Sequence, residues 1–347
     1  MARKKYSIGF RLTAALAAIL IFIVLVEAVL RLVAADDYFQ NRFFIVNRAL
    51  DYPEIFQRDR DLFWRFRPDR TVTSKFFEGE TYRINSQGLR GDEVPVEKTS
   101  KRIITLGNSC TFGWGVPLAQ TYSEQLEKNL QRQHEVINGA VPGYSTFQGR
   151  KFFESDLSQL NPDIVTVLFA WNDHWAAASQ IADKDQEFPP QIILAAQNFL
   201  ARFHFYRLMK KTLLSAVEKN PDSTFDRGNI VYRVGLDDFG LNLKEICERV
   251  REAGATPILL TSPIPSLEKY YLPGARSSLH AFHEKYNQMI RNVSAANDID
   301  LVDLAREFDK HDGLWDDAPR DPIHFNARGH ALAARLIADY IEKNIGP

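Results

Sequence analysis

Five short apolar runs after residue 101 constrain the fold of this chain more than any other feature. The runs are rich in β-branched residues, and amphipathic stretches with helical periodicity separate them. Apolar strands that alternate with helices are typical of a parallel sheet covered by helices on both faces. The predicted strands are 102–106, 135–137, 163–169, 256–261 and 299–303. The predicted helices lie near 120–133, 145–160, 236–253, 277–297 and 326–343, and Gly254 fits a helix stop.

Residues 1–35 predict a short cytoplasmic stub followed by a transmembrane signal-anchor. Several basic residues precede an apolar run over 12–26, and the continuation to Ala35 adds only two charges, Glu27 and Arg31. These two residues are four apart and share one helix face in the favourable order, so they can pair near the far membrane interface. A helix over 12–35 is long enough to span a bilayer.

The basic stub also predicts an orientation for this helix. The positive-inside rule places the N-terminus in the cytoplasm and the residues after 36 outside. We therefore expect a single-pass protein of the cytoplasmic (inner) membrane whose main domain is periplasmic or otherwise extracytoplasmic. The alternative is a cleaved signal peptide, because Val33–Ala35 offers small residues to a peptidase. With such a cleavage site, the segment that contains Glu27 and Arg31 would make the region between the apolar run and the cut longer than is usual for a signal peptide. This length favours the uncleaved anchor.

Two further segments accompany the α/β domain predicted over 102–347. Residues 36–101 are rich in aromatic and charged side chains, and 71–77 and 81–85 fit two short strands joined by a turn at Gly79, so we expect a β-rich collar. An insertion at about 175–233 contains Pro189–Pro190, a helical stretch over 192–217 and a polar loop. Two interpretations stay open: a cap over the ligand end of the sheet, or an arm packed against the collar or the membrane surface.

Charge and cysteine content argue against several classes of partner and site. Forty-three Lys and Arg oppose 44 Asp and Glu, for a formal charge of −1, so no basic excess is present to bind nucleic acid. Cys110 and Cys247 lie far apart without a CxxC motif, which is not the pattern of a disulfide framework or a zinc site. His280 and His283 are expected on one exposed helix face, with no third ligand at helical spacing. We expect no metal or organic cofactor, and protein partners are unknown.

The first predicted strand runs directly into the turn Gly107–Gly113, which contains Ser109. A serine at the carboxyl end of a parallel strand, flanked by glycines, lies where open α/β sheets bind ligands. Ser109 is therefore a candidate nucleophile. The turn has neither the glycine spacing nor the lysine of a phosphate loop, and Thr111 replaces the second glycine of the α/β-hydrolase elbow.

A serine nucleophile needs a base, and the base needs an orienting acid. Asp321 and His324 occur in one short loop just before the last predicted helix. A single rigid loop can present both side chains and fix the tautomer of the imidazole. His324 is thus the candidate base and Asp321 its partner, whereas His330 is expected to pack or be solvated on the helix.

Acyl transfer through a serine nucleophile also needs hydrogen-bond donors for the tetrahedral oxyanion. The second strand leads into a turn at Gly143, and the third leads into Asn172. Gly143 offers a backbone N–H without a side chain in the way, and Asn172 offers a side-chain amide. Both strand ends are expected at the same rim of the sheet as Ser109.

Taken in order, the Gly107–Gly113 turn, the Gly143 turn, Trp171–Asp173 and Asp321–His324 resemble the four sequence blocks of the SGNH (GDSL-type) hydrolase superfamily, over residues 102 to about 343. The resemblance implies a flavodoxin-like three-layer α/β/α sandwich whose five-stranded parallel sheet has the order 2-1-3-4-5. It further implies a set of roles: Ser109 as nucleophile, His324 as base, Asp321 as its partner, and Ser109, Gly143 and Asn172 as the oxyanion hole. The chain departs from the family at Asn108, where Asp is usual, which affects fine tuning rather than the triad.

These observations predict a serine-dependent ester hydrolase, an acyl or acetyl esterase that acts outside the cytoplasmic membrane. The combination of anchor, collar and α/β domain is similar to bacterial membrane-bound members of the superfamily, several of which act on acylated envelope polysaccharides. Acylated envelope glycans or lipid esters are therefore the expected substrates. Two alternatives stay open: an O-acyltransferase that passes the acyl group to a polysaccharide with the same site, and a non-catalytic envelope binding module.

Overall fold

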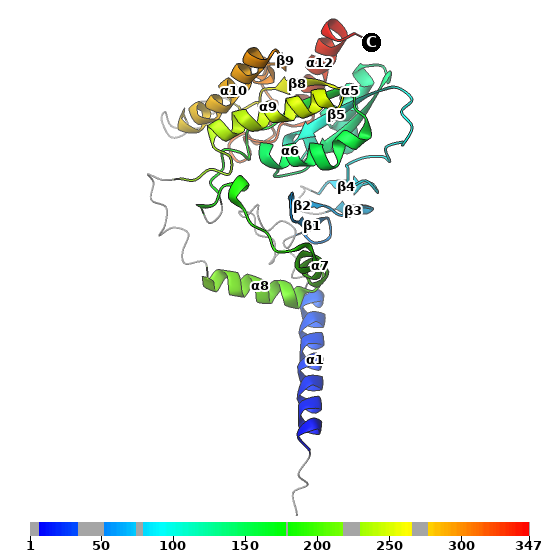
Figure 1. The fold of residues 1–347 in the computed structure, drawn as a ribbon, viewed down its shortest axis with the longest axis vertical. Helices are drawn as coiled ribbons and strands as arrows, with labels where there is room; N and C mark the ends of the chain where they lie inside the picture. Colours follow the sequence, from blue (N-terminus) through cyan, green and yellow to red (C-terminus); the bar gives the residue numbers. More distant parts are fainter. Residues whose placement is uncertain are drawn as a thin grey trace, which may run out of the picture.

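A five-stranded parallel sheet forms the centre of the computed structural model, which describes residues 7–33, 52–73, 79–177, 180–217, 230–265 and 277–346 (Figure 1). The strands are β5 (Lys101–Gly107), β6 (His134–Ala140), β7 (Ile164–Leu168), β8 (Thr256–Leu260) and β9 (Asp300–Val302). Their order is β6-β5-β7-β8-β9, and every neighbouring pair is parallel. This order is the predicted 2-1-3-4-5, so the predicted fold class is confirmed.

Helices cover both faces of the sheet. One face carries α5 (Tyr122–Asn129), α11 (Leu304–Phe308) and α12 (Ala327–Asn344), and the other carries α6 (Thr146–Ser155), α9 (Leu236–Glu252) and α10 (Ser277–Asn297). The five predicted helices all form. The N-terminal end of α12 is capped by Asn326, whose side chain accepts hydrogen bonds from the backbone N–H groups of Arg328 and Gly329.

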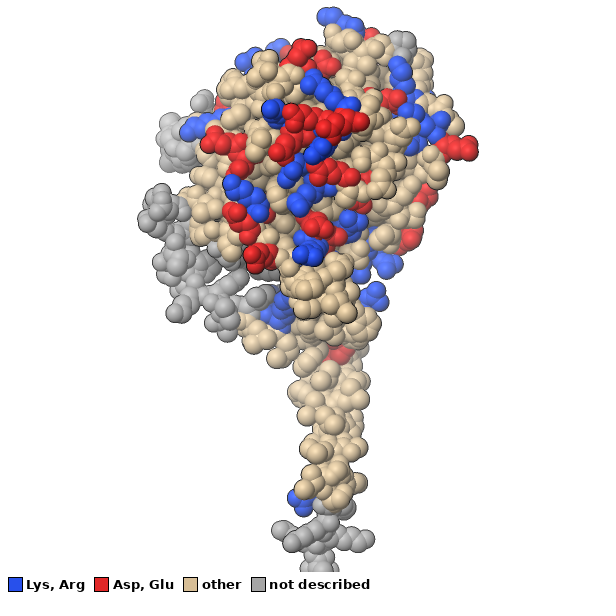
Figure 2. Space-filling model, in the orientation of Figure 1, with Lys and Arg blue, Asp and Glu red and all other residues tan. Residues whose placement is uncertain are grey.

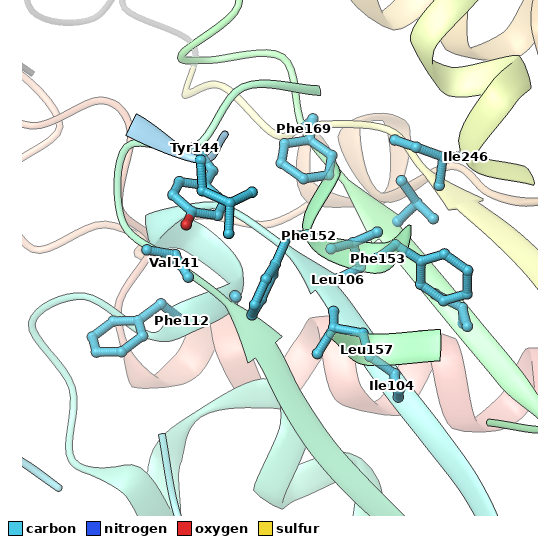
Figure 3. Packing of buried hydrophobic residues seen from close by; sticks show 14 of the residues in the cluster. Ile104, Leu106, Phe112, Val141, Tyr144, Phe152, Phe153, Leu157, Phe169 and Ile246 are labelled. Atoms are coloured by element: carbon cyan, nitrogen blue, oxygen red, sulfur yellow. The ribbon is translucent and has the colours of Figure 1, made fainter. Parts of the chain in front are cut away.

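Alternate residues of each strand point into two separate cores. On β5, Ile103 belongs to the core under α5 and α12, whereas Ile104 and Leu106 belong to the core under α6 and α9. Figure 3 shows part of the second core, where Phe152 of α6 and Ile246 of α9 lie near Leu106. Because both faces are buried, the strands read as continuous apolar runs.

The described part of the collar, residues 52–73 and 79–101, contains two hairpins. β1 (Phe56–Asp59) pairs antiparallel with β2 (Phe63–Phe66), and β3 (Arg70–Thr73) pairs antiparallel with β4 (Thr81–Ile84). The second hairpin matches the two predicted strands, except that 74–78 lie outside the described residues. The first hairpin had no clear sequence signal, because Phe56, Phe63, Trp64 and Phe66 are all buried instead of alternating with polar residues.

The N-terminal helix α1 (Ile8–Leu32) projects from the main domain and contacts α8 at its C-terminal end (Figure 1). It is 25 residues long, is apolar enough to cross a bilayer, and buries none of its residues. Ser7 caps its first turn. The predicted C-terminal limit at Ala35 lies outside the described residues.

The helical part of the insertion packs against the collar and α1. The single stretch predicted over 192–217 is two helices, α7 (Gln191–Leu200) and α8 (His204–Val217). The break has a tertiary cause, because the carboxylate of Glu27 on α1 accepts a hydrogen bond from the backbone N–H of Phe205 at 2.8 Å and so stabilises the start of α8. α7 in turn hydrogen-bonds to β1. These contacts favour the packing-arm interpretation for the two helices.

Candidate active site

Ser109 lies on a sharp turn at the carboxyl end of β5, as the first residue of the short helix α4 (Ser109–Phe112). Asn108 caps this helix, since its Oδ1 accepts a hydrogen bond from the backbone N–H of Cys110 at 3.0 Å. Gly107 is required here: a Cβ at this position would lie 2.1 Å from Thr111 Oγ1 and 2.8 Å from the backbone oxygen of Leu168. The turn therefore holds Ser109 in a fixed place at the rim of the sheet.

His324 and Asp321 meet Ser109 at this rim. The distance from His324 Nε2 to Ser109 Oγ is 2.8 Å, and that from His324 Nδ1 to Asp321 Oδ2 is 2.6 Å. The other carboxylate oxygen, Asp321 Oδ1, accepts hydrogen bonds from the backbone N–H groups of Ile323 and His324. The structure thus brings together three residues that are separated by as many as 215 positions in the sequence.

The surroundings keep Asp321 charged and His324 in place. Burial on its own would raise the pKa of the Asp321 carboxyl, but the hydrogen bond and charge of His324 and the two backbone N–H groups outweigh it, so the pKa lies below its ordinary value. An ionised Asp321 fixes the proton of His324 on Nδ1, which leaves Nε2 free to accept a proton from Ser109. The ring of Trp114 stacks on the imidazole with centroids 5.6 Å apart, and Cys110 Sγ donates to the backbone oxygen of Ile323.

Gly143 and Asn172 follow the two strands on either side of β5. Gly107 pairs with Ala140 of β6 and with Leu168 of β7, so both strand ends lie beside the Ser109 turn. Gly143 has φ +86°, a conformation that favours glycine. Asn172 is buried, and its Nδ2 donates to the backbone oxygen of Tyr144 at 3.1 Å. An amide carries two hydrogens, so one remains for a ligand.

The peptide that carries the Gly143 N–H is held from its opposite side. Trp64 of the collar donates its indole N–H to the backbone oxygen of Pro142 at 3.2 Å. The described residues contain no cis peptide bond, and in a planar trans peptide the C=O of Pro142 and the N–H of Gly143 point in opposite directions. The hydrogen bond from Trp64 therefore helps to fix the direction of the Gly143 N–H.

A buried ion pair holds the next peptide of the same turn. Arg233 and Asp183 are each 3% exposed in their side chains and lie 2.8 Å apart. Arg233 also donates to the backbone oxygen of Gly143 at 2.7 Å and to Gln148 Oε1 at 2.6 Å. Sequence reasoning missed this pair, because nothing in the local sequence around Asp183 or Arg233 signals that either charge is buried.

Two other histidines considered in the sequence, His283 and His330, are buried and hydrogen-bonded inside the sheet domain. The prediction that His283 lies on an exposed face of its helix is wrong: it is fully buried, with Nδ1 at 2.9 Å from His174 Nε2 and Nε2 at 2.9 Å from the backbone oxygen of Ser262. Helix α10 turns this face toward β8, a packing choice that spacing does not reveal. His330 packs inside and accepts a hydrogen bond from the backbone N–H of Tyr122. Among the described residues, no group of three or more potential ligands is arranged to hold a metal ion.

Comparison with known proteins gives a family match and several similar folds. The model of the GDSL-like Lipase/Acylhydrolase family matches residues 105–332, a span that contains all the candidate site residues. A lipase/acylhydrolase from Enterococcus faecalis is 18% identical, with 70% of this chain and 95% of that chain covered and a TM-score of 0.45. A GDSL-like lipase from Bacteroides thetaiotaomicron VPI-5482 is 17% identical, with 73% and 92% covered and a TM-score of 0.44. An acetylxylan esterase from Geobacillus stearothermophilus is 16% identical, with 71% and 96% covered and a TM-score of 0.45. No curated protein matches the chain.

Proposed function

Because the chain belongs to the GDSL-like lipase/acylhydrolase family and is an SGNH-type ester hydrolase, we propose that Ser109, His324 and Asp321 are its catalytic triad. The observation that carries the proposal is the continuous hydrogen-bonded chain from Asp321 through His324 to Ser109. Nucleophile, base and orienting acid are all within hydrogen-bond distance, which is the arrangement that serine-dependent acyl transfer requires.

The reaction starts with attack of Ser109 Oγ on the carbonyl carbon of an ester, while His324 Nε2 takes the hydroxyl proton. Asp321 stabilises the imidazolium that forms. The tetrahedral intermediate collapses, the ester C–O bond breaks, and His324 returns the proton to the leaving alcohol. Water then attacks the acyl-enzyme with the same base, and the carboxylic acid and free Ser109 are released.

The oxyanion of each intermediate is stabilised by the backbone N–H groups of Ser109 and Gly143 and by the side-chain amide of Asn172. Ser109 is the first residue of α4, where backbone N–H groups lack helical partners. Trp64 and Arg233 are positioning residues, because they hold the peptides on both sides of Gly143. In this proposal the collar and the insertion each support the hydrolase site.

The proposed location is the outer side of the cytoplasmic membrane, with α1 as an uncleaved anchor, and the proposed substrates are acylated envelope glycans or lipid esters. The length and composition of α1 and the basic residues that precede it support the anchor. A cysteine at Val96, which is 97% exposed on the collar, tests the orientation. A membrane-impermeant maleimide should label Val96→Cys in intact spheroplasts, since both native cysteines are buried. Labelling only after lysis would overturn the proposed orientation.

A fluorophosphonate probe tests the catalytic assignment on the full chain. The wild type should react with the probe at one serine, and Ser109→Ala should abolish both labelling and ester turnover. Ser123→Ala is a matched control, because Ser123 is also buried but bonds to Thr105 rather than to a histidine. Labelling of Ser109→Ala at wild-type rate would rule out Ser109 as the nucleophile.

A panel of acetyl and longer acyl esters, with and without a glycan acceptor, then tests the reaction type. We expect free carboxylic acid as the main product. If acylated acceptor is the main product, the reaction is acyl transfer rather than hydrolysis. The assignment of the triad would still hold, because only the acceptor of the acyl group differs.

A further inference from the structure

Helix α7 presents its apolar side to the outside of the molecule. Gln197 and Asn198 bind it to β1: Asn198 Oδ1 accepts from the backbone N–H of Arg58 at 2.7 Å, and Gln197 Oε1 accepts from the Arg58 side chain at 2.8 Å. Ile192 and Phe199, two helical turns apart on the same face, are 79% and 56% exposed. A helix of a soluble domain normally buries its apolar face and exposes its polar one. Helix α7 buries Leu194 but turns most of its other apolar side chains outward, while its polar Gln197 and Asn198 face β1.

The exposed apolar side continues into α8. Met209 and Leu213, four residues apart on one face, are exposed, and so is Phe203 in the connection, whose ring lies 5.7 Å from that of Phe199. Between residues 191 and 217 the sequence contains four basic residues and no acidic one. Exposed apolar side chains combined with net positive charge are typical of helices that lie in a membrane interface.

The position of α8 relative to α1 is fixed by polar contacts. Glu27 of α1 accepts from the backbone N–H of Phe205 at 2.8 Å and lies 3.4 Å from His204 Nδ1. Arg31 donates to Glu27 at 2.8 Å and to the backbone oxygen of Arg202 at 3.2 Å. These contacts give a structural role to Glu27 and Arg31, the two charged residues near the C-terminal end of α1. They also place α8 across the end of α1 rather than along it (Figure 1).

We propose that residues 191–213 lie on the surface of a lipid bilayer, beside the point where α1 enters it. The occupant is a bilayer rather than a second protein because α8, which continues the exposed apolar side of α7, contacts the C-terminal end of α1, an apolar helix with no buried residue. In Figure 2, charged side chains are spread over the large lobe, whereas the stem formed by α1 is almost free of them. Arg202 is exposed and Lys210 and Lys211 are partly exposed, so these three basic residues can meet anionic lipid headgroups, whereas Arg207 is buried.

This proposal rests on the proposed anchoring of the chain through α1, and it adds a constraint that an anchor alone does not supply. A single helix leaves the attached domain free to tilt. Here α7 is bonded to β1, and Trp64 of the neighbouring strand β2 is bonded to the Pro142 peptide of the site. Docking of 191–213 would thus hold the site at one height and one tilt above the bilayer.

The test places an environment-sensitive NBD fluorophore on single cysteines of the full chain in vesicles that contain doxyl-labelled quencher lipids. The test positions are Phe199→Cys on α7 and Leu213→Cys on α8. Leu20→Cys on α1 reports the anchor, and Leu241→Cys on α9 is a matched control with comparable exposure on the large lobe. Labelling of Ser109 by the fluorophosphonate probe confirms that each variant is folded.

We expect the doxyl lipids to quench NBD several-fold more strongly at positions 199 and 213 than at 241, with an emission shift to shorter wavelength. Quenching at position 20 without quenching at 199 and 213 would overturn this inference and leave the anchor standing. Absence of quenching at all four positions would overturn both. Disulfide cross-links between chains of the unlabelled Phe199→Cys variant, without lipid quenching of its labelled form, would identify a second copy of the chain as the occupant and would also overturn the inference.

Discussion

Replacing Arg233 and Asp183 together tests whether Arg233 orients the turn at Gly143. The double variant removes this contact without leaving an unpaired buried charge, so the effect on activity can be measured apart from a large loss of stability. Arg233→Met alone would leave Asp183 as a buried carboxylate without its cation, and breaking such a pair costs about 3–5 kcal/mol. The double variant Arg233→Met/Asp183→Asn carries no unpaired charge, so its stability loss should be much smaller. In both variants the backbone oxygen of Gly143 loses the donor that now lies 2.7 Å away.

The magnitude of the activity loss follows from the role proposed for Gly143. Complete loss of one oxyanion donor lowers kcat by about 10²–10³-fold. Trp64 still holds the Pro142 oxygen in the double variant, so the Gly143 N–H keeps part of its orientation. We therefore expect kcat to fall at least about 10-fold, within that upper limit, while KM changes little, because the interaction is made mainly in the transition state.

The assay is steady-state hydrolysis of a short acyl ester by the full chain in detergent, with thermal unfolding measured in parallel. Arg102→Met/Glu135→Gln is a matched control, because Arg102 is 2% exposed and forms an ion pair with Glu135 at the opposite end of β5. The control should lose stability without a drop in kcat. A double Arg233/Asp183 variant that unfolds at a lower temperature but keeps wild-type kcat would refute the positioning role.

Three further predictions concern single features of the site and the core. Asn172→Ala should lower kcat about 10²–10³-fold with little change in KM, and unchanged turnover would remove its amide from the oxyanion hole. Asn108→Ala should cost about 1 kcal/mol of stability through the lost cap, whereas Asn108→Asp should stay near wild type in unfolding temperature; equal losses would contradict the capping role. Burial lowers the pKa of His174 to about 4 and the pKa values of His283 and His330 to about 3, against an ordinary value of 6.5. Below pH 6.5 these three imidazoles bind more protons in the unfolded chain than in the folded chain, and they outnumber the opposite contribution of Asp173, whose pKa burial raises to about 7. The unfolding temperature should therefore fall as pH decreases from 6.5 to 4, and a flat profile would be inconsistent with neutral buried imidazoles.

Local sequence patterns were sufficient to predict the strands and main helices of the central sheet and to single out Ser109, Asp321 and His324 as the proposed triad. β5 to β9 are apolar because both faces of the sheet are buried, and this property is written in the residues of each strand. Ser109 follows a strand and a glycine directly, and Asp321 and His324 lie in one turn, so short-range spacing brings acid and base together. The strand order was predicted from the family resemblance, because hydrophobic periodicity predicts strands but not their order in a sheet.

Features that depend on distant contacts were not predictable. His283 was expected at the surface and is buried, because the packing of α10 on the sheet selects which face turns inward. The helical stretch 192–217 breaks where Glu27, 178 residues earlier, accepts the backbone N–H of Phe205. Nothing in the local sequence marks His204 as the start of a helix, since the carboxylate that stabilises the first turn belongs to α1.

The same distinction applies within the site. Neighbouring residues determine where a nucleophile, a base and its acid can occur, because turns and short spacings depend on the local sequence. The orientation of the Gly143 N–H depends on Trp64 and Arg233, which reach that turn from 78 and 90 residues away. The sequence alone does not show whether a tryptophan or an arginine is exposed or is buried and hydrogen-bonded to a backbone oxygen. Burial and hydrogen-bond partners exist only once the collar, the sheet and the insertion have packed together.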